Sequence, residues 1–244
     1  MRILVTNDDG YASEGIQVLA SALRTRHEVW VVAPVADRSG VSHGLTMEDP
    51  VRFRVEGERD FTCSGLPVDC AITGSQGIMP CLPDLVISGI NRGANLGTDI
   101  VYSGTAAAAR QASIDGIPGV AVSLVSKNGE YLWEPLARFV LENLDSLVSL
   151  SSRDVFVNVN APSQPSYRGV KITGISRRVY RDSIIMHDGP DGCKYSFFRG
   201  GTIRTDGDGT TDWDAVEAGF VSVTRVLALP IAAPGGNDMP PFTV

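Results

Sequence analysis

Hydrophobic and polar positions in residues 1–160 follow two alternating patterns. Short uninterrupted apolar runs are typical of buried strands, and apolar residues that recur every three or four positions indicate an amphipathic helix. In the first helical segment, for example, Ile16, Leu19 and Leu23 share one face. The apolar runs predict strands at 2–6, 28–33, 84–88, 119–124 and 154–160. The helical segments are predicted at 14–25, 67–79, 105–114 and 135–148.

Strands that alternate with helices predict βαβ units around a largely parallel sheet, which is an α/β fold. After about residue 162 the pattern changes to short strands separated by Gly, Pro and Asp turns, which indicate hairpins. These strands are predicted at 170–176, 178–186, 194–199 and 219–226. We therefore expect a core in residues 1–160 and a hairpin-rich C-terminal region in residues 161–244. A short helix and the last strand, near 211–226, are expected to rejoin the core, and the proline-rich tail at 231–244 to be extended or disordered.

The composition excludes several classes of protein. A chain of 244 residues that is 43% hydrophobic and 20% charged can bury a large core, which excludes intrinsic disorder. The chain has no apolar run near the ~18 residues of a membrane span, so no membrane is expected as a partner. The formal net charge of −7 argues against binding to long nucleic acid, which requires a basic surface. A small anionic substrate would need a cation to offset the repulsion.

The four cysteines, at 63, 70, 81 and 193, form no C-x-x-C pair, which argues against a structural zinc site. They are expected to be reduced and mostly buried, as in a cytoplasmic protein. The first residues also lack the pattern of a signal peptide, because a run of only three apolar residues is followed by acids. A cytoplasmic location is therefore expected.

Oxygen-bearing side chains follow three of the predicted strands. Asp8 and Asp9 come after the first strand, Ser39 after the second and Asn91 after the third. The carboxyl ends of parallel strands lie at one edge of a sheet, and Gly10 permits the turn that lets two adjacent aspartates converge there. Taken singly, each residue is more simply explained as part of a turn or cap. Taken together, they predict a site for a hard cation, Mg²⁺ or Mn²⁺, because all the ligands are oxygens.

The loop after the third strand leads into the start of the Ala-rich helix. The loop carries three glycines four residues apart, with Asn95 between the second and the third, and Ser103, Gly104 and Thr105 stand at the head of the helix. A helix N-terminus with Ser and Thr donors is a ready site for an anion, although the same residues also make an ordinary helix cap. These four residues are expected to hold a phosphate. A hard cation beside a phosphate favours metal-assisted phosphoryl transfer to water.

In that chemistry Asp8 and Asp9 are the expected catalytic residues, and one of them orients or deprotonates the water. Residues 40–44 also match G-x-S-x-G, which makes Ser42 the nucleophile of an alternative serine hydrolase. That motif belongs directly between a strand and a helix, whereas Pro34 has already closed the strand and no helical pattern follows. A non-catalytic nucleotide sensor is the other alternative.

The motifs resemble those of the SurE family, the stationary-phase survival protein nucleotidases. The resemblance is strong over about residues 1–125 and moderate over 205–225. It is carried by residues 3–10, 33–34 with 38–40, 65–70, 88–97, 102–106 and 211–224.

The resemblance implies a Rossmann-like three-layer core. It implies one divalent metal ion per subunit, Mg²⁺ or Mn²⁺, at positions that match Asp8, Asp9, Ser39 and Asn91. The implied activity is that of a phosphomonoesterase that acts on nucleoside 5′- and 3′-monophosphates. The implied assembly is a homodimer or homotetramer built in part from exchanged C-terminal hairpins. Base preference, 5′ against 3′ preference and subunit number stay open.

Overall fold

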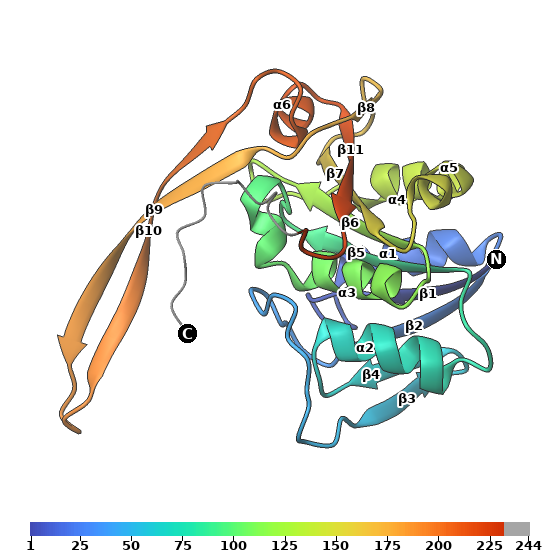
Figure 1. Ribbon diagram of the computed structural model, residues 1–244, viewed down its shortest axis with the longest axis horizontal. Helices are drawn as coiled ribbons and strands as arrows, with labels where there is room; N and C mark the ends of the chain where they lie inside the picture. The colour runs from blue at the N-terminus through green and yellow to red at the C-terminus, as the bar shows by residue number, and fades with distance from the viewer. Residues whose placement is uncertain (232–244) are drawn as a thin grey trace, which may run out of the picture.

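A nine-stranded, mainly parallel sheet forms the centre of the protein, for which a computed structural model describes residues 1–231 (Figure 1). The strand order is β3-β4-β2-β1-β5-β6-β7-β11-β8. The central parallel strands are β1 (Arg2–Thr6), β2 (Glu28–Pro34), β5 (Leu85–Arg92), β6 (Gly119–Val125) and β7 (Val155–Pro162). The outer strands are β3 (Phe53–Gly57), β4 (Asp60–Cys63), β8 (Val170–Ile172) and β11 (Val221–Leu227).

Helices cover both faces of this sheet and complete a three-layer, Rossmann-like core. One face carries α1 (Glu14–Arg24), α4 (Trp133–Glu142) and α5 (Leu144–Leu150), and the other carries α2 (Pro67–Thr73) and α3 (Gly104–Ile114). In β1, Ile3 and Val5 pack on the α1 side while Leu4 packs on the α2 side. Because both faces are covered, the strands are continuous apolar runs. The predicted α/β fold is confirmed.

Several predicted boundaries were wrong for local reasons. The segment 135–148 is not one helix, because the chain breaks at Asn143, whose side chain donates a 2.9 Å hydrogen bond to the carbonyl of Phe139. The segment 67–79 continues past α2 as a π-helical turn, Gly74–Ile78. Strands β3 and β4 were not predicted, because both are short; in β3, Phe53 and Val55 alternate with charged residues, but the strand is mostly exposed.

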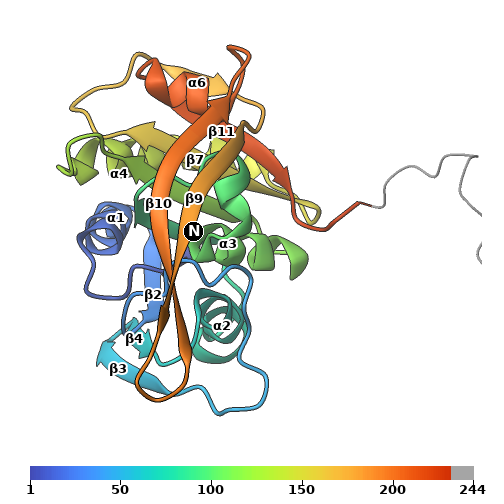
Figure 2. The same ribbon diagram turned by 90° about the vertical axis from the view of Figure 1, so that its left-hand side faces the viewer.

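A long hairpin extends from the core as an arm, seen in two orthogonal views (Figures 1 and 2). It consists of β9 (Arg177–Asp188) and β10 (Lys194–Asp206), which pair antiparallel. The predicted hairpin is confirmed, but β10 is longer than expected because a bulge at Gly200–Gly201 interrupts its pattern. A Cβ on Gly201 would lie 1.7 Å from the carbonyl oxygen of Arg181, so this position requires glycine. We call β9 and β10 together the arm.

After the arm the chain returns to the core through α6 (Asp212–Glu217) and β11. Strand β11 pairs antiparallel with β7 and parallel with β8. The predicted tail lies outside the described residues from position 232 on.

Cys63 and Cys70 are buried but Cys81 and Cys193 are exposed, so the expectation of mostly buried thiols was wrong for half of them. Among residues 1–231, no helix combines the length and apolar character of a membrane span.

Candidate active site

Asp8 lies at the carboxyl end of β1 and faces the start of α3. Its side chain is almost fully buried, with 4% exposed. One carboxylate oxygen accepts the backbone N–H of Thr105 at 2.9 Å, and the other accepts the Thr105 hydroxyl. A Cβ on Gly104 would lie 2.9 Å from the Cβ of Asp8, so only glycine lets the helix approach so closely. Burial raises the pKa of Asp8, and the two bonds from Thr105 oppose that shift.

Asp9 follows Asp8 and faces the end of β5. Its carboxylate accepts the backbone N–H of Arg92 at 2.8 Å. The pKa of Asp9 is raised to about 6: burial is the largest cause, the negative charges of Asp8 and Asp37 add to it, and the hydrogen bond from Arg92 opposes it. Asp9 and Asp37 line a hollow next to the one that Asp8 lines, with Arg92 at the border of both.

A cavity of about 580 Å³ opens beside Asp8 at this edge of the sheet. The structure brings five of the eight predicted site residues into its lining, namely Asp8, Ser39, Asn91, Asn95 and Ser103. They come from the ends of β1 and β5, the loop after β2 and the start of α3, as expected for ligands at the carboxyl ends of parallel strands. Gly104 and Thr105 support Asp8 from behind, and Asp9 lies in the adjoining hollow.

The oxygens around Asp8 form a donor set suited to a hard cation. The Asn91 amide nitrogen donates to the Gly93 carbonyl at 3.1 Å, which leaves its oxygen 3.5 Å from the Thr105 hydroxyl. That hydroxyl also bonds Asp8, so the Asn91 and Asp8 oxygens lie around one point. Ser39 donates its hydroxyl to Asp37 at 2.6 Å, and its own oxygen keeps acceptor capacity.

The electrostatics also fit a bound cation. The carboxylates of Asp8, Asp9 and Asp37 lie close enough that Asp37 raises the pKa of both others. Within residues 1–231 none of the three forms an ion pair. A divalent ion would offset this excess of negative charge. The described chain holds no cluster of three or more Cys, His, Asp and Glu ligands, so neutral oxygens must complete the set.

Asn95 and Ser103 form the side of the cavity where a phosphate is expected. Asn95 is held by a buried amide cluster: its backbone N–H donates to Asn160 at 3.0 Å, its carbonyl accepts from Asn158 at 2.8 Å, and its side chain donates to Ser123 at 2.8 Å. Ser103 accepts the N–H of Ala106 at 3.0 Å as the N-cap of α3. Ser103 is therefore both an ordinary cap and part of the cavity wall, with its hydroxyl hydrogen still able to donate.

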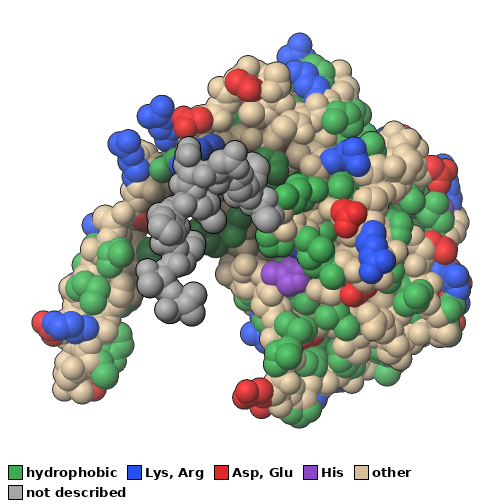
Figure 3. Space-filling model, viewed as in Figure 1, with side chains coloured by type: hydrophobic (Ala, Val, Ile, Leu, Met, Phe, Trp, Pro, Cys, Tyr) green, Lys and Arg blue, Asp and Glu red, His purple; other side chains and the backbone are tan. Residues whose placement is uncertain are grey.

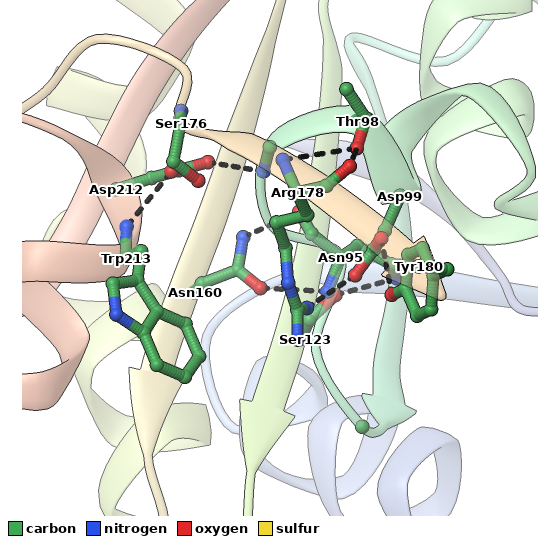
Figure 4. A network of polar contacts seen from close by, with 12 residues as sticks. Asn95, Thr98, Asp99, Ser123, Asn160, Ser176, Arg178, Tyr180, Asp212 and Trp213 are labelled. Atoms are coloured by element: carbon green, nitrogen blue, oxygen red, sulfur yellow. Dashed lines mark hydrogen bonds and ion pairs between the residues drawn. The ribbon is translucent and has the colours of Figure 1, made fainter. Parts of the chain in front are cut away.

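Sequence reasoning missed the residues that the arm contributes. Tyr180, Asp182 and Phe198, all on the arm, line the same cavity as Asp8. Figure 4 shows how the base of the arm is fixed to the core: Arg178 pairs with Asp99, and the Tyr180 hydroxyl donates to Asp99 at 2.5 Å. No sequence signal marks these contacts, which join residues about 80 positions apart. Asp37 was also missed, although the sequence does contain a signal for it: it lies in the loop after β2, two residues before Ser39.

The geometry does not support a serine nucleophile. The Ser42 hydroxyl donates to the Val101 carbonyl at 2.7 Å, and His43 bonds the Gln111 side chain at 2.9 Å rather than Ser42. Ser42 has a positive φ of 55°, but its segment lies in the loop between β2 and β3 and no helix follows it. The strand–turn–helix context that a nucleophile elbow requires is therefore missing at this motif.

Comparison with known proteins gives consistent matches. The family model described as survival protein SurE matches residues 3–182. The 5′-nucleotidase SurE of Thermosipho melanesiensis is 41% identical over 233 residues, 93% of this chain and 91% of that protein. The protein of the same name from Treponema pallidum is 51% identical over 176 residues, 68% of this chain and 93% of that protein. The crystal structure of the SurE protein from Aquifex aeolicus superposes with a TM-score of 0.80 at 34% identity, covering 93% of this chain and 94% of that one.

Proposed function

The chain belongs to the SurE family, and on that premise we propose that it is a metal-dependent 5′-nucleotidase that works at the cavity beside Asp8. The activity is hydrolysis of nucleoside monophosphates to nucleoside and phosphate, and the proposal extends to 3′-monophosphates. One observation carries it for this chain. A buried carboxylate at the end of β1 is held by the start of α3, and Ser39 and Asn91 share its cavity.

Asp8, Asp9, Ser39 and Asn91 are the residues that we assign to one ion per subunit, Mg²⁺ or Mn²⁺. The oxygen donors and the unpaired negative charge described above support this assignment. When bound, such an ion polarises a phosphate oxygen and lowers the pKa of a bound water. Asp9 lines the hollow that adjoins the cavity. We therefore include it among the metal ligands because its negative charge lies beside that of Asp8.

The phosphate contacts that we assign are the Asn95 amide, the Ser103 hydroxyl and the N–H of Gly104 at the start of α3. The partial positive charge of a helix N-terminus favours an anion there. Thr105, expected from sequence to bind phosphate, donates both its N–H and its hydroxyl to Asp8. We therefore reassign it as a positioning residue that fixes the carboxylate for the reaction.

The test of this function is phosphate release from a panel of nucleoside monophosphates by protein first stripped of metal. Activity is expected only after addition of Mn²⁺ or Mg²⁺, and it should disappear again with EDTA. Activity that survives EDTA and is lost to a serine-directed reagent would point to Ser42 instead. Binding of nucleotide and metal without phosphate release would point to a sensor.

We also propose that the arm joins copies of this chain in a homodimer or homotetramer. The arm exposes large apolar side chains along its length, including Ile184, Met186 and Phe197. Exposed apolar surface of this kind is typical of an interface. Light scattering after size-exclusion chromatography gives the subunit number directly, and a monomer at micromolar concentration would contradict the proposal.

We also propose a cytoplasmic location, because the four thiols are unpaired.

A further inference from the structure

The metal and phosphate assignments use only one wall of the cavity. The rest of the lining includes aromatic and acidic side chains: Tyr102 on the core and Tyr180, Asp182 and Phe198 on the arm, which form the arm wall. Both arm rings are accessible, with 42% of Tyr180 and 76% of Phe198 exposed. The space-filling view shows apolar side chains along the arm and an open gap between the outer part of the arm and the core (Figure 3). Nothing in the phosphate chemistry explains why aromatic rings should stand there.

The strand register shows that these residues share one face of the arm. Tyr180, Asp182 and Ile184 alternate along β9 and therefore point to the same side. Phe198 stands directly across from Ile184 in the antiparallel pair, and paired residues share a face. The adjacent Phe197 pairs with Ile185 and points to the other side. The face with Tyr180 and Phe198 is thus the one turned toward the core.

The base of the arm is fixed to the core, so the Tyr180 ring is held in place before any ligand arrives. The ion pair between Arg178 and Asp99 is mostly buried, with 8% and 13% of the two side chains exposed. The Thr98 hydroxyl donates to the Arg178 carbonyl at 2.6 Å, and the Tyr180 hydroxyl bonds Asp99. Thr98 and Asp99 belong to the 3-10 helix Gly97–Val101, which leads directly into Ser103 of the phosphate wall. The aromatic wall and the phosphate wall are therefore tied together.

Charge sets the direction in which an anionic ligand lies across the cavity. Asp182 brings a carboxylate to the arm wall, and that carboxylate forms no ion pair within residues 1–231. Once a cation offsets the charge of Asp8 and its neighbours, a phosphate would be attracted to the start of α3 and repelled by Asp182. The part of the ligand farthest from its phosphate is then directed toward the rings.

We propose that Tyr180 and Phe198 form the subsite for the nucleobase of the substrate. The proposal rests on the proposed function, because it takes the substrate to be a nucleoside monophosphate. Every base has a π face, so stacking on these rings accepts all bases and gains most from the larger purines. The Tyr180 ring is held by its hydroxyl bond to Asp99, while Phe198 supplies a ring that is free to adapt.

The test compares AMP with ribose 5-phosphate, which carries the same phosphate and sugar but no base. The readout is the ratio of kcat/KM for the two substrates with saturating Mn²⁺, because defects in folding, metal binding or assembly act on both substrates alike. Phe198→Ala is expected to lower this ratio roughly tenfold through loss of stacking, and Phe198→Trp to preserve it. Phe197→Ala, which removes the same ring from the opposite face, is the matched control and should leave the ratio unchanged.

An unchanged ratio in Phe198→Ala would overturn the subsite, as would an equal fall in Phe197→Ala. Equilibrium titration of the same three variants with AMP and ribose 5-phosphate gives the corresponding ratio of dissociation constants without turnover. If the wild-type protein binds AMP but hydrolyses neither compound, the proposed function fails while the titration still decides the subsite. If binding of AMP and of ribose 5-phosphate is equally tight in the wild type, the subsite fails even though hydrolysis stands.

Discussion

The wall of the cavity that belongs to the core and the wall that belongs to the arm differ in how they are held. On the core wall, Asp8 is 4% exposed and receives two hydrogen bonds from one residue of α3. On the arm wall, Phe198 is 76% exposed and stands on a two-stranded sheet whose base is anchored to the core through Arg178 and Asp99. A rigid, buried wall suits bond cleavage, which needs groups fixed to a fraction of an ångström, and an open wall suits a variable base.

The two walls are also expected to affect the reaction differently when they are mutated. Substitutions on the core wall should reduce catalysis for every phosphomonoester, because all of them share the phosphate. Substitutions on the arm wall should act mainly on substrates that carry a base. If substitutions on both walls lowered kcat/KM equally for substrates with and without a base, the two walls would not have separate roles. The variants below test this, from the largest expected effect to the smallest.

The largest effect is expected from Asp8→Asn. The change keeps the shape of the side chain but removes the negative charge at the end of β1. We expect kcat/KM to fall by about a thousandfold for AMP and ribose 5-phosphate alike, as when a group that stabilises transition-state charge is removed. Steady-state assays over a range of Mn²⁺ concentrations measure it, with thermal melting to show that the fold is intact. Turnover like that of the wild type at limiting Mn²⁺ would contradict the assignment.

Thr105→Val tests how the core wall is held. Valine has nearly the shape of threonine and keeps the backbone N–H bond to Asp8, but it loses the hydroxyl that bonds the second carboxylate oxygen. Groups that orient a metal ligand typically contribute 10–100-fold, so we expect a loss of about that size in activity or Mn²⁺ affinity.

Two further variants serve as controls for Thr105→Val. Thr105→Ser restores the hydroxyl and should recover most of the activity. Ser113→Ala, farther along α3, removes a hydroxyl that bonds Val155 and lies away from the cavity. If Ser113→Ala costs as much as Thr105→Val, the loss reflects helix stability rather than the position of Asp8.

Arg178→Met tests the anchor between the two walls. It removes the guanidinium from Asp99 and from its stacking positions over Trp213 and Tyr180. Because a looser arm must be ordered when substrate binds, we expect KM for AMP to rise about fivefold, with kcat within about twofold of the wild type. Hydrogen exchange should increase in the arm while the core strands keep their protection. A fall in kcat for ribose 5-phosphate would mean that the anchor also positions the phosphate wall.

The core wall was largely predictable from sequence, and the reason is local. Buried parallel strands are apolar runs, so their ends are visible, and polar residues that follow them meet at one edge. Asp8, Ser39 and Asn91 were found in this way. That Asp9 lines the adjoining hollow and bonds the Arg92 N–H was not predicted, because the sequence pattern does not show which strand end a side chain contacts. The two hydrogen bonds from Thr105 to Asp8 were also missed, since a helix-capping residue and a residue that bonds a carboxylate look alike in sequence.

The arm wall was not predictable, because both of its faces are exposed. Strand alternation identifies a buried face only where one side is covered, and along the arm apolar residues occupy both sides, as Phe197 and Phe198 illustrate. The contact between Asp99 and Tyr180 joins segments about 80 residues apart and has no local pattern. Only the hairpin itself could be inferred, from the turn residues between its strands.

The smallest effect is expected from Gly201→Ala, which tests whether the two arm strands must keep their register. A Cβ at position 201 would lie 1.7 Å from the Arg181 carbonyl oxygen, whereas a Cβ at Gly200 meets nothing within 4 Å. Gly201→Ala must therefore change the bulge that lies between Tyr180 and Phe198 along the arm, and Gly200→Ala is its matched control. We expect a fall of about threefold in the ratio of kcat/KM for AMP to that for ribose 5-phosphate, since one of two stacking rings is displaced. The ratio should stay unchanged in Gly200→Ala, and kcat for ribose 5-phosphate should stay unchanged in both. If both variants lower the ratio equally, the alignment of the two rings does not matter and the arm wall acts only as a flexible apolar cover.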